Sequence, residues 1–418
     1  MSFPPARPHA SPAAEAAALL CRIGLALLGI AVPAVAMGTR RAMFVLMPVG
    51  AALILVAALL DSRSDALVRL RIALASPLAL AALFLLGWAV ISCAWAPFRP
   101  EATARFAKEA GTLVLAATVC AFMPERTRVS NMYLWPVGAA IAAVTAIVIA
   151  LAGPALLTVA QDGENSTLER GLLALTVLLW PALGALALRG RWNTAGALAI
   201  LAALASISVW SAPGLLALIA GALVFALAVG HPGRAAYGLG GFFAMLLLVA
   251  PGLPVLIALA LPRGEADGTN FLGDAAASIR VWADIVHTDK WRLLTGHGID
   301  SATRGVVAGL LPARAPDGLL YEVWFELGAL GALAAAVLVY QAFLACARQS
   351  AVLAPFLIAG LSSFLVIAVL GFSLSQLWWV TMAGIIGIGC VHVQRGQYLS
   401  RRPQFEPERM RAGSAQQA

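Results

Sequence analysis

Long apolar runs alternate with short polar connections along almost the whole chain. A helix of about 17 to 25 apolar residues crosses a hydrocarbon core of roughly 30 Å, and runs of this length recur throughout. We predict twelve spans, at about residues 15–37, 43–60, 75–96, 107–123, 133–153, 171–188, 193–211, 213–230, 236–261, 319–345, 351–370 and 373–393. The pattern therefore predicts an all-α polytopic membrane protein.

One long polar interruption, from about Arg263 to Asp317, separates the ninth predicted span from the tenth. The predicted division is a disordered cytoplasmic N-terminus (1–14), spans one to nine (15–262), a periplasmic loop (263–318), spans ten to twelve (319–394) and a basic cytoplasmic tail (395–418). The loop contains Arg280, His287, Lys290, Arg292, His297, Arg304 and Arg314. It is therefore the natural place for an anionic substrate to meet the protein.

Two stretches of this loop show helical periodicity. In residues 274–291, apolar side chains share one helical face (Ile279, Trp282, Ile285 and Val286), and charged or polar ones lie around the other (Arg280, Asp284, His287 and Asp289). This is the pattern of an amphipathic helix at a membrane interface. A second short helix is predicted within residues 301–311. We expect the two helices to lie on the membrane surface, as a wall over a cavity between the spans.

The distribution of lysine and arginine predicts the orientation, because these residues are enriched on the cytoplasmic side. With a cytoplasmic N-terminus, fifteen of them fall in cytoplasmic segments and six in the short connections on the other side. Both termini are thus predicted to be cytoplasmic and the long loop periplasmic, in a bacterial inner membrane. The first run has Arg22 near its start and resembles a signal peptide, but the many later spans favour an uncleaved anchor.

Composition and charge agree with a membrane protein. The chain has 61% hydrophobic and 11% charged residues, whereas soluble domains have about 25% charged residues. Its mean hydropathy is +0.89. We assign the net charge of +8 to cytoplasmic loops and not to nucleic-acid binding, because no basic run is interleaved with exposed aromatic residues.

The sequence holds no signal for a metal or other cofactor. The cysteines lie in apolar runs without metal-site spacing; they are Cys21, Cys93, Cys120, Cys346 and Cys390. HExxH, GxSxG, P-loop and dinucleotide motifs do not occur. Hydrolase, kinase, NTPase and dehydrogenase functions therefore have no support.

Three arginines are candidates for binding an anion, because a guanidinium group contacts phosphate oxygens at two points and stays charged at physiological pH. Arg280 and Arg304 lie in the long loop, and Arg170 begins a span. Each also has an ordinary alternative. Arg280 and Arg304 would then be solvated charges balanced by nearby acids, and Arg170 an anchor at a helix end, beside Glu169.

His297 is a candidate general base. It lies between two glycines in the segment LTGHGID, where backbone amides could also approach a ligand. An imidazole with a pKa of about 6.5 suits proton transfer near neutral pH. A single histidine in a loop is, however, more often without a catalytic role.

A longer motif runs through this region: R-x-W, then L-x-G-H-G-I, then P-x7-W-x-E-L-G-x-x-G. Its residues are Arg280, Trp282, Gly296, His297, Gly298, Pro316, Trp324, Glu326, Leu327, Gly328 and Gly331. The motif resembles the O-antigen ligase and O-antigen polymerase superfamily between about residues 270 and 335. Elsewhere the likeness is architectural, in twelve spans, a large loop after the ninth, and an arginine before a "WP" helix, here Arg170 with Trp180 and Pro181.

The resemblance implies metal-independent glycosyl transfer in the periplasm, and so lipopolysaccharide or polysaccharide biosynthesis. The donor would be a glycan on undecaprenyl pyrophosphate, and the acceptor a sugar hydroxyl of the lipid A core in a ligase or of another lipid-linked repeat in a polymerase. Arg170, Arg280 and Arg304 would hold the pyrophosphate, with Arg304 the least securely aligned.

The chain departs from the family where a base is expected. Members usually read P-H-N-x-x-L before the W-x-E-L-G element, but here Asp317 replaces the histidine and Gly318 the asparagine. Three interpretations remain open: Asp317 is the base, His297 has taken over, or the protein is a degenerate member without transferase activity. If Asp317 is the base, nearby arginines would lower its pKa and weaken it.

Other functions also remain open. Within the enzyme class these are an exopolysaccharide polymerase or a protein O-glycosylating ligase. Outside it, the chain could be a transporter or a non-catalytic assembly partner. A transporter places ionisable residues near the membrane midplane, whereas the middles of these spans are almost free of charge.

Overall fold

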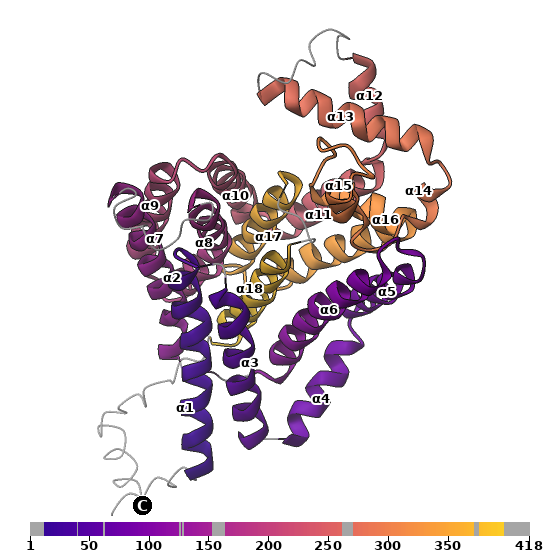
Figure 1. Cartoon of the computed structure of the whole chain (residues 1–418). Coiled ribbons are helices and arrows are strands. Elements are labelled where there is room, and N and C mark those ends of the chain that lie inside the picture. Colours follow the sequence, from indigo (N-terminus) through magenta and orange to yellow (C-terminus); the bar gives the residue numbers. More distant parts are fainter. Residues whose placement is uncertain are drawn as a thin grey trace, which may run out of the picture.

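The computed structural model describes residues 12–39, 41–61, 63–124, 127, 129–152, 164–260, 271–371 and 376–396. In this part of the chain all regular structure is helical (Figure 1), which confirms the all-α prediction. Most of the predicted N-terminal segment 1–14 and basic tail 395–418 lies outside the described residues. Of the first, residues 12–14 belong to a helix and are not disordered.

In chain order the helices are α1 (Pro12–Ala26), a π-helical turn (Leu27–Ala31), α2 (Val32–Ala36), α3 (Ala42–Asp61), α4 (Arg63–Leu74), α5 (Pro77–Ser92), a 3-10 turn (Cys93–Trp95), α6 (Arg99–Phe122), a second 3-10 turn (Val129–Tyr133), α7 (Leu134–Ala152), α8 (Glu164–Ala187), α9 (Trp192–Ser208), α10 (Ala212–Gly230), α11 (Pro232–Val249), α12 (Gly252–Ala260), α13 (Phe271–Thr288), α14 (Arg292–Thr295), α15 (Ser301–Val307), α16 (Leu319–Ala347), α17 (Ala354–Val369) and α18 (Leu377–Arg395).

Many of these helices suit a bilayer. Among the described residues, nine helical stretches are long and apolar enough to cross it. α9 and α17 are apolar but shorter, and α6 carries charges in its first half. These helices together fall on the twelve predicted spans. The chain is therefore a multi-pass membrane protein, and the number of crossings stays a prediction.

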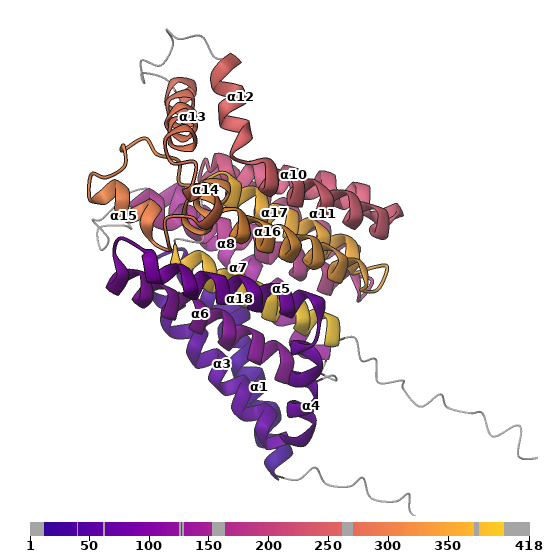
Figure 2. The same cartoon turned by 90° about the vertical axis from the view of Figure 1, so that its right-hand side faces the viewer.

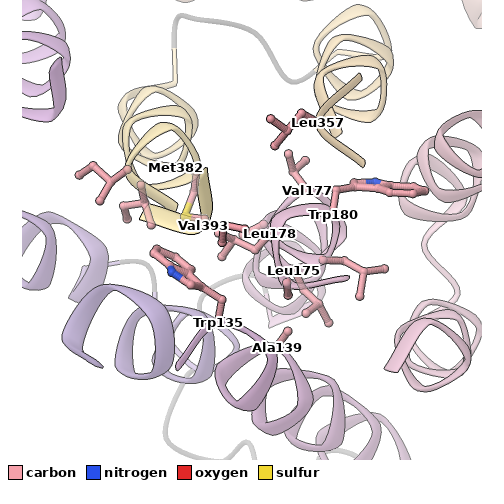
Figure 3. Close-up of a cluster of buried hydrophobic side chains, with 14 of the residues drawn as sticks. Trp135, Ala139, Leu175, Val177, Leu178, Trp180, Leu357, Met382 and Val393 are labelled. Atoms are coloured by element: carbon pink, nitrogen blue, oxygen red, sulfur yellow. The ribbon is translucent and has the colours of Figure 1, made fainter. Parts of the chain in front are cut away.

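α8 is the central helix of the bundle. Every residue from 171 to 187 is buried, because α7, α9, α17 and α18 all pack against this helix. Figure 3 shows part of the core, where Leu175, Val177 and Trp180 lie among side chains of the surrounding helices. The Trp180 indole donates a hydrogen bond of 2.9 Å to Ser363 Oγ, so the polar atom of this buried ring is satisfied.

Two helix boundaries differ from the prediction. α8 begins at Glu164, so Arg170 lies within the helix and not at its start. The ninth predicted span, 236–261, is broken into α11 and α12 around Pro251, because proline has no amide hydrogen to donate within a helix. α12 then turns away from α11 (Figure 2).

Both predicted loop helices are present, as α13 and α15. The apolar face of α13 packs on the protein itself. The centroids of the Trp282 ring and of the Tyr321 ring of α16 lie 5.5 Å apart. Ile285 packs against the buried apolar cluster that contains Tyr321. The start of α1 and the end of α18 lie at the end of the bundle away from α13 and α15 (Figures 1 and 2).

Candidate functional site

A break in α16 organises the outer end of the bundle, which is the end that carries α13 to α15. Gly328 has φ +65° and ψ −162°, which is not helical. The break frees carbonyl groups in the preceding turn, at Phe325, Glu326 and Leu327. A buried carbonyl needs a donor from elsewhere, and a broken span is tolerated only where protein supplies it.

The Gly-His-Gly turn supplies two of these donors. The backbone amide of His297 donates to Phe325 O at 2.8 Å, and that of Gly298 donates to Glu326 O at 2.9 Å. The Trp88 indole of α5 donates to Leu327 O at 2.8 Å. The two halves of the motif, L-x-G-H-G-I and W-x-E-L-G, are therefore hydrogen-bonded partners in one junction.

Glycine is required on both sides of this junction. A Cβ atom on Gly328 would lie 2.5 Å from Gly296 N, and one on Gly296 would lie 2.2 Å from Glu326 O. Gly296 also has φ +73°. The backbones approach too closely for side chains, which gives the motif glycines a structural reason.

Beneath the junction, Arg105 of α6 gathers three carboxylates. Its side chain is only 13% exposed. It donates to Glu109 Oε1 at 2.8 Å, to Asp300 Oδ1 at 3.0 Å and to Glu326 Oε1 at 3.5 Å. Asp300 also accepts from Arg304 Nε. The cluster therefore ties α6, α15 and α16 together.

A cavity of about 110 Å³ adjoins this cluster. Its polar lining comes from Arg105, Glu109, Glu322 and Glu326, and the rest is apolar. The carboxylates of the cluster and the cavity outnumber the two arginines, Arg105 and Arg304.

Comparisons with protein-family models, with curated proteins and with solved structures find no match for this chain. The roles of the predicted site residues must therefore be inferred from their own contacts.

Asp317 lies just before α16, against the end of α17. A Cβ atom on Gly371 would be 3.2 Å from Asp317 Oδ1. Burial raises the pKa of the Asp317 carboxyl, and a backbone hydrogen bond offsets part of that rise.

Gly318 lies where α16 and α17 meet closely. A Cβ atom there would lie 2.8 Å from Val369 O, so the backbone of α17 leaves no room for a side chain.

His297 is held in a packed position. Its ring stacks on Phe325 with centroids 4.1 Å apart, and Nδ1 lies 3.1 Å from Phe325 O. Nε2 lies 3.4 Å from Asp289 Oδ2. These contacts join the turn to α13 and α16, and none of them reaches Asp317.

The three candidate arginines lie in different surroundings. Arg170 is half-buried, with its guanidinium 5.7 Å from the centroid of the Trp378 ring at the start of α18. Arg280 is half-buried on α13. Arg304 is exposed on α15, and its Nε is engaged by Asp300.

Two of the five predicted residues lie against consecutive helices: Asp317 beside Gly371, just after α17, and Arg170 beside Trp378, at the start of α18. His297 and Arg304 have their contacts in the α13 to α16 region instead.

Sequence reasoning missed the Arg105 cluster. The apolar pattern places Arg105 just before the predicted span 107–123, among the charges of a short connection, and Glu326 enters only as a motif position. Two signals were available: an acid inside an apolar span, which needs a partner, and the Arg105–Glu109 spacing of four residues on one helix.

Proposed function

We propose that this protein is a metal-independent glycosyltransferase of the O-antigen ligase type. It would transfer a glycan from undecaprenyl pyrophosphate to a sugar hydroxyl of the lipid A core, at the periplasmic face of a bacterial inner membrane. The observation that carries the proposal is that Asp317 lies beside Gly371, just after α17, and Arg170 beside Trp378, at the start of α18. The motif resemblance supplies the reaction class.

Asp317 is the general base in this proposal. Its carboxylate takes the proton from the acceptor hydroxyl, whose oxygen attacks the anomeric carbon of the donor. The bond from that carbon to the phosphate oxygen breaks, and the pyrophosphate leaves with the bonding electrons. Burial raises the pKa of Asp317, which strengthens it as a base because its proton affinity rises.

Arginines neutralise the leaving group. Arg170 lies against Trp378 at the start of α18, the helix that follows the one beside Asp317. Arg280 and Arg304 would hold the pyrophosphate from the loop. Arg304 uses Nε for Asp300 and keeps its terminal amino groups for phosphate oxygens.

A deletion strain complemented with the wild-type gene or with an Asp317→Asn gene tests the proposal. We expect deletion to remove long glycan chains from the lipid A core, and only the wild-type gene to restore them. Loss of chain extension, with attachment intact, would assign a polymerase instead. An unchanged lipopolysaccharide and exopolysaccharide profile would overturn the proposal in favour of a non-catalytic member.

A further inference from the structure

α12 and α13 form an arm that projects sideways from the helix bundle. In Figure 2, α10, α11, α16 and α17 run across the view, whereas α12 turns upward from the end of α11 and α13 is seen end-on beside it. The two helices pack against each other. α12 has nine residues, which extend about 14 Å, so it cannot cross a core of roughly 30 Å.

The surface of α12 is apolar and largely uncovered. Its sequence, GLPVLIALA, has no polar side chain. Leu256 is 65% exposed, Leu259 79% and Ile257 41%. A helix that is apolar on all sides is stable only when it is buried in protein or in lipid, so this face needs a cover that the described part of the chain does not provide.

α13 does not need the same cover. Its apolar face lies against Tyr321 and Phe325, through Trp282 and Ile285. Asp284, on its other side, is exposed. The apolar face of α13 is thus covered by α16, whereas the apolar surface of α12 is left uncovered.

The turn after α13 carries the residues of a membrane-interface anchor. Lys290, Trp291 and Arg292 are all exposed, and Trp291 is 91% exposed. Tryptophan flanked by cations is typical of the headgroup level, where the indole and the positive charges both find partners. Trp210 is 85% exposed. Its neighbour Ser211 donates a hydrogen bond to Glu169, in the first half of α8, so Trp210 lies near the start of that helix.

We propose that the arm rests on the surface of the lipid bilayer. Leu256 and Leu259 lie among acyl chains just below the phospholipid headgroups, and Trp291 lies at headgroup level. We propose lipid and not a protein partner as the cover of α12 because α12 continues directly from α11. α12 begins three residues after α11, which is long and apolar enough to cross a bilayer and exposes Phe242 (59%) and Met245 (58%), so the bare face of α12 extends that apolar surface.

Site-directed spin labelling of the full chain in phosphatidylcholine and phosphatidylglycerol nanodiscs tests the arm. Leu256→Cys and Leu259→Cys carry the label, and the unsubstituted chain gives the background from native cysteines. Asp284→Cys on α13 is the water-facing control. Leu223→Cys, in the middle of α10 and 62% exposed, is the control for the bilayer interior. Each label is scored for collisions with oxygen, which concentrates in lipid, and with a water-soluble nickel chelate.

We expect the ratio of oxygen to nickel collisions at both α12 positions to exceed that at Asp284→Cys severalfold and to stay below that at Leu223→Cys. A nickel accessibility equal to that of Asp284→Cys would mean that α12 faces water. Protection from both reagents would mean that a second copy or another protein covers it. Equality with Leu223→Cys would mean deep insertion, and each of these three results would overturn the proposal.

Discussion

Arg105 is the residue on which the buried carboxylates of the outer end depend. Asp300 and Glu326 are each about 5% exposed, so both would be left in a poorly solvated place without its guanidinium. Removing one partner of a buried ion pair costs about 3 to 5 kcal/mol. We therefore expect Arg105→Ala to lower the unfolding temperature of the purified protein strongly.

Arg99→Ala is the matched control for this change, since Arg99 lies on the same helix but is exposed. It should leave the unfolding temperature almost unchanged. Equal effects of the two substitutions would contradict the role of Arg105 in the cluster.

Asp317 predicts the pH dependence of transfer. Only the deprotonated carboxylate can accept a proton, and burial raises its pKa above the ordinary aspartate value of about 4. Activity should therefore fall, as the pH is lowered, at a higher pH than for an ordinary aspartate. The rate of transfer, measured against pH in reconstituted membranes, tests this fall in activity. A rate that stays constant down to a pH of about 4 would argue against Asp317 as the base.

At the residue level, the sequence alone singled out Asp317 and Arg170, which lie against the end of α17 and the start of α18. It did not identify the Arg105 cluster, because that cluster exists only where α6, α15 and α16 meet. Nor did it show that the ring of His297 stacks on Phe325, which required the position of the α16 break.

Among the elements, the junction between α16 and the Gly-His-Gly turn is the most constrained. Gly328→Ala would place a methyl group 2.5 Å from Leu294 O, in a backbone conformation that suits glycine. Backbone strain of this kind costs on the order of 1 to 3 kcal/mol. We expect a lower unfolding temperature and faster amide hydrogen exchange at His297 and Gly298.

Gly241→Ala is the comparison for that experiment, because a Cβ atom on Gly241 would meet open space. This substitution should leave the unfolding temperature unchanged or raise it slightly, since alanine has a higher helix propensity than glycine. Unchanged exchange at His297 in Gly328→Ala would show that the junction does not depend on the glycine.

The helices themselves were largely predictable, because the length of an apolar run is a local property of the sequence. Each predicted span falls on a helix, and α13 and α15 were also expected. The break at Pro251 was missed because the apolar run continues through it. The partner of the α13 apolar face could not be predicted, since it depends on how the loop folds back onto α16.

For the whole molecule, the excess of arginine in one set of connections predicts the orientation. The structure places the start of α1 and the end of α18 at the same end of the bundle, opposite α13 and α15 (Figures 1 and 2). A reporter fused after about residue 265 or 310 should therefore be periplasmic, and one at the C-terminus cytoplasmic. Reversed signals would place Asp317 in the cytoplasm and remove the basis for the proposed reaction.

The most direct test of the proposed reaction compares glycan transfer by wild-type protein, Asp317→Asn and the exposed control Asp284→Asn in vesicles with lipid-linked donor and acceptor. The asparagine keeps the size of Asp317 but cannot take a proton. We predict that Asp317→Asn loses about two to four powers of ten in rate, with donor binding intact and Asp284→Asn unaffected. Transfer by Asp317→Asn at the wild-type rate would contradict the account.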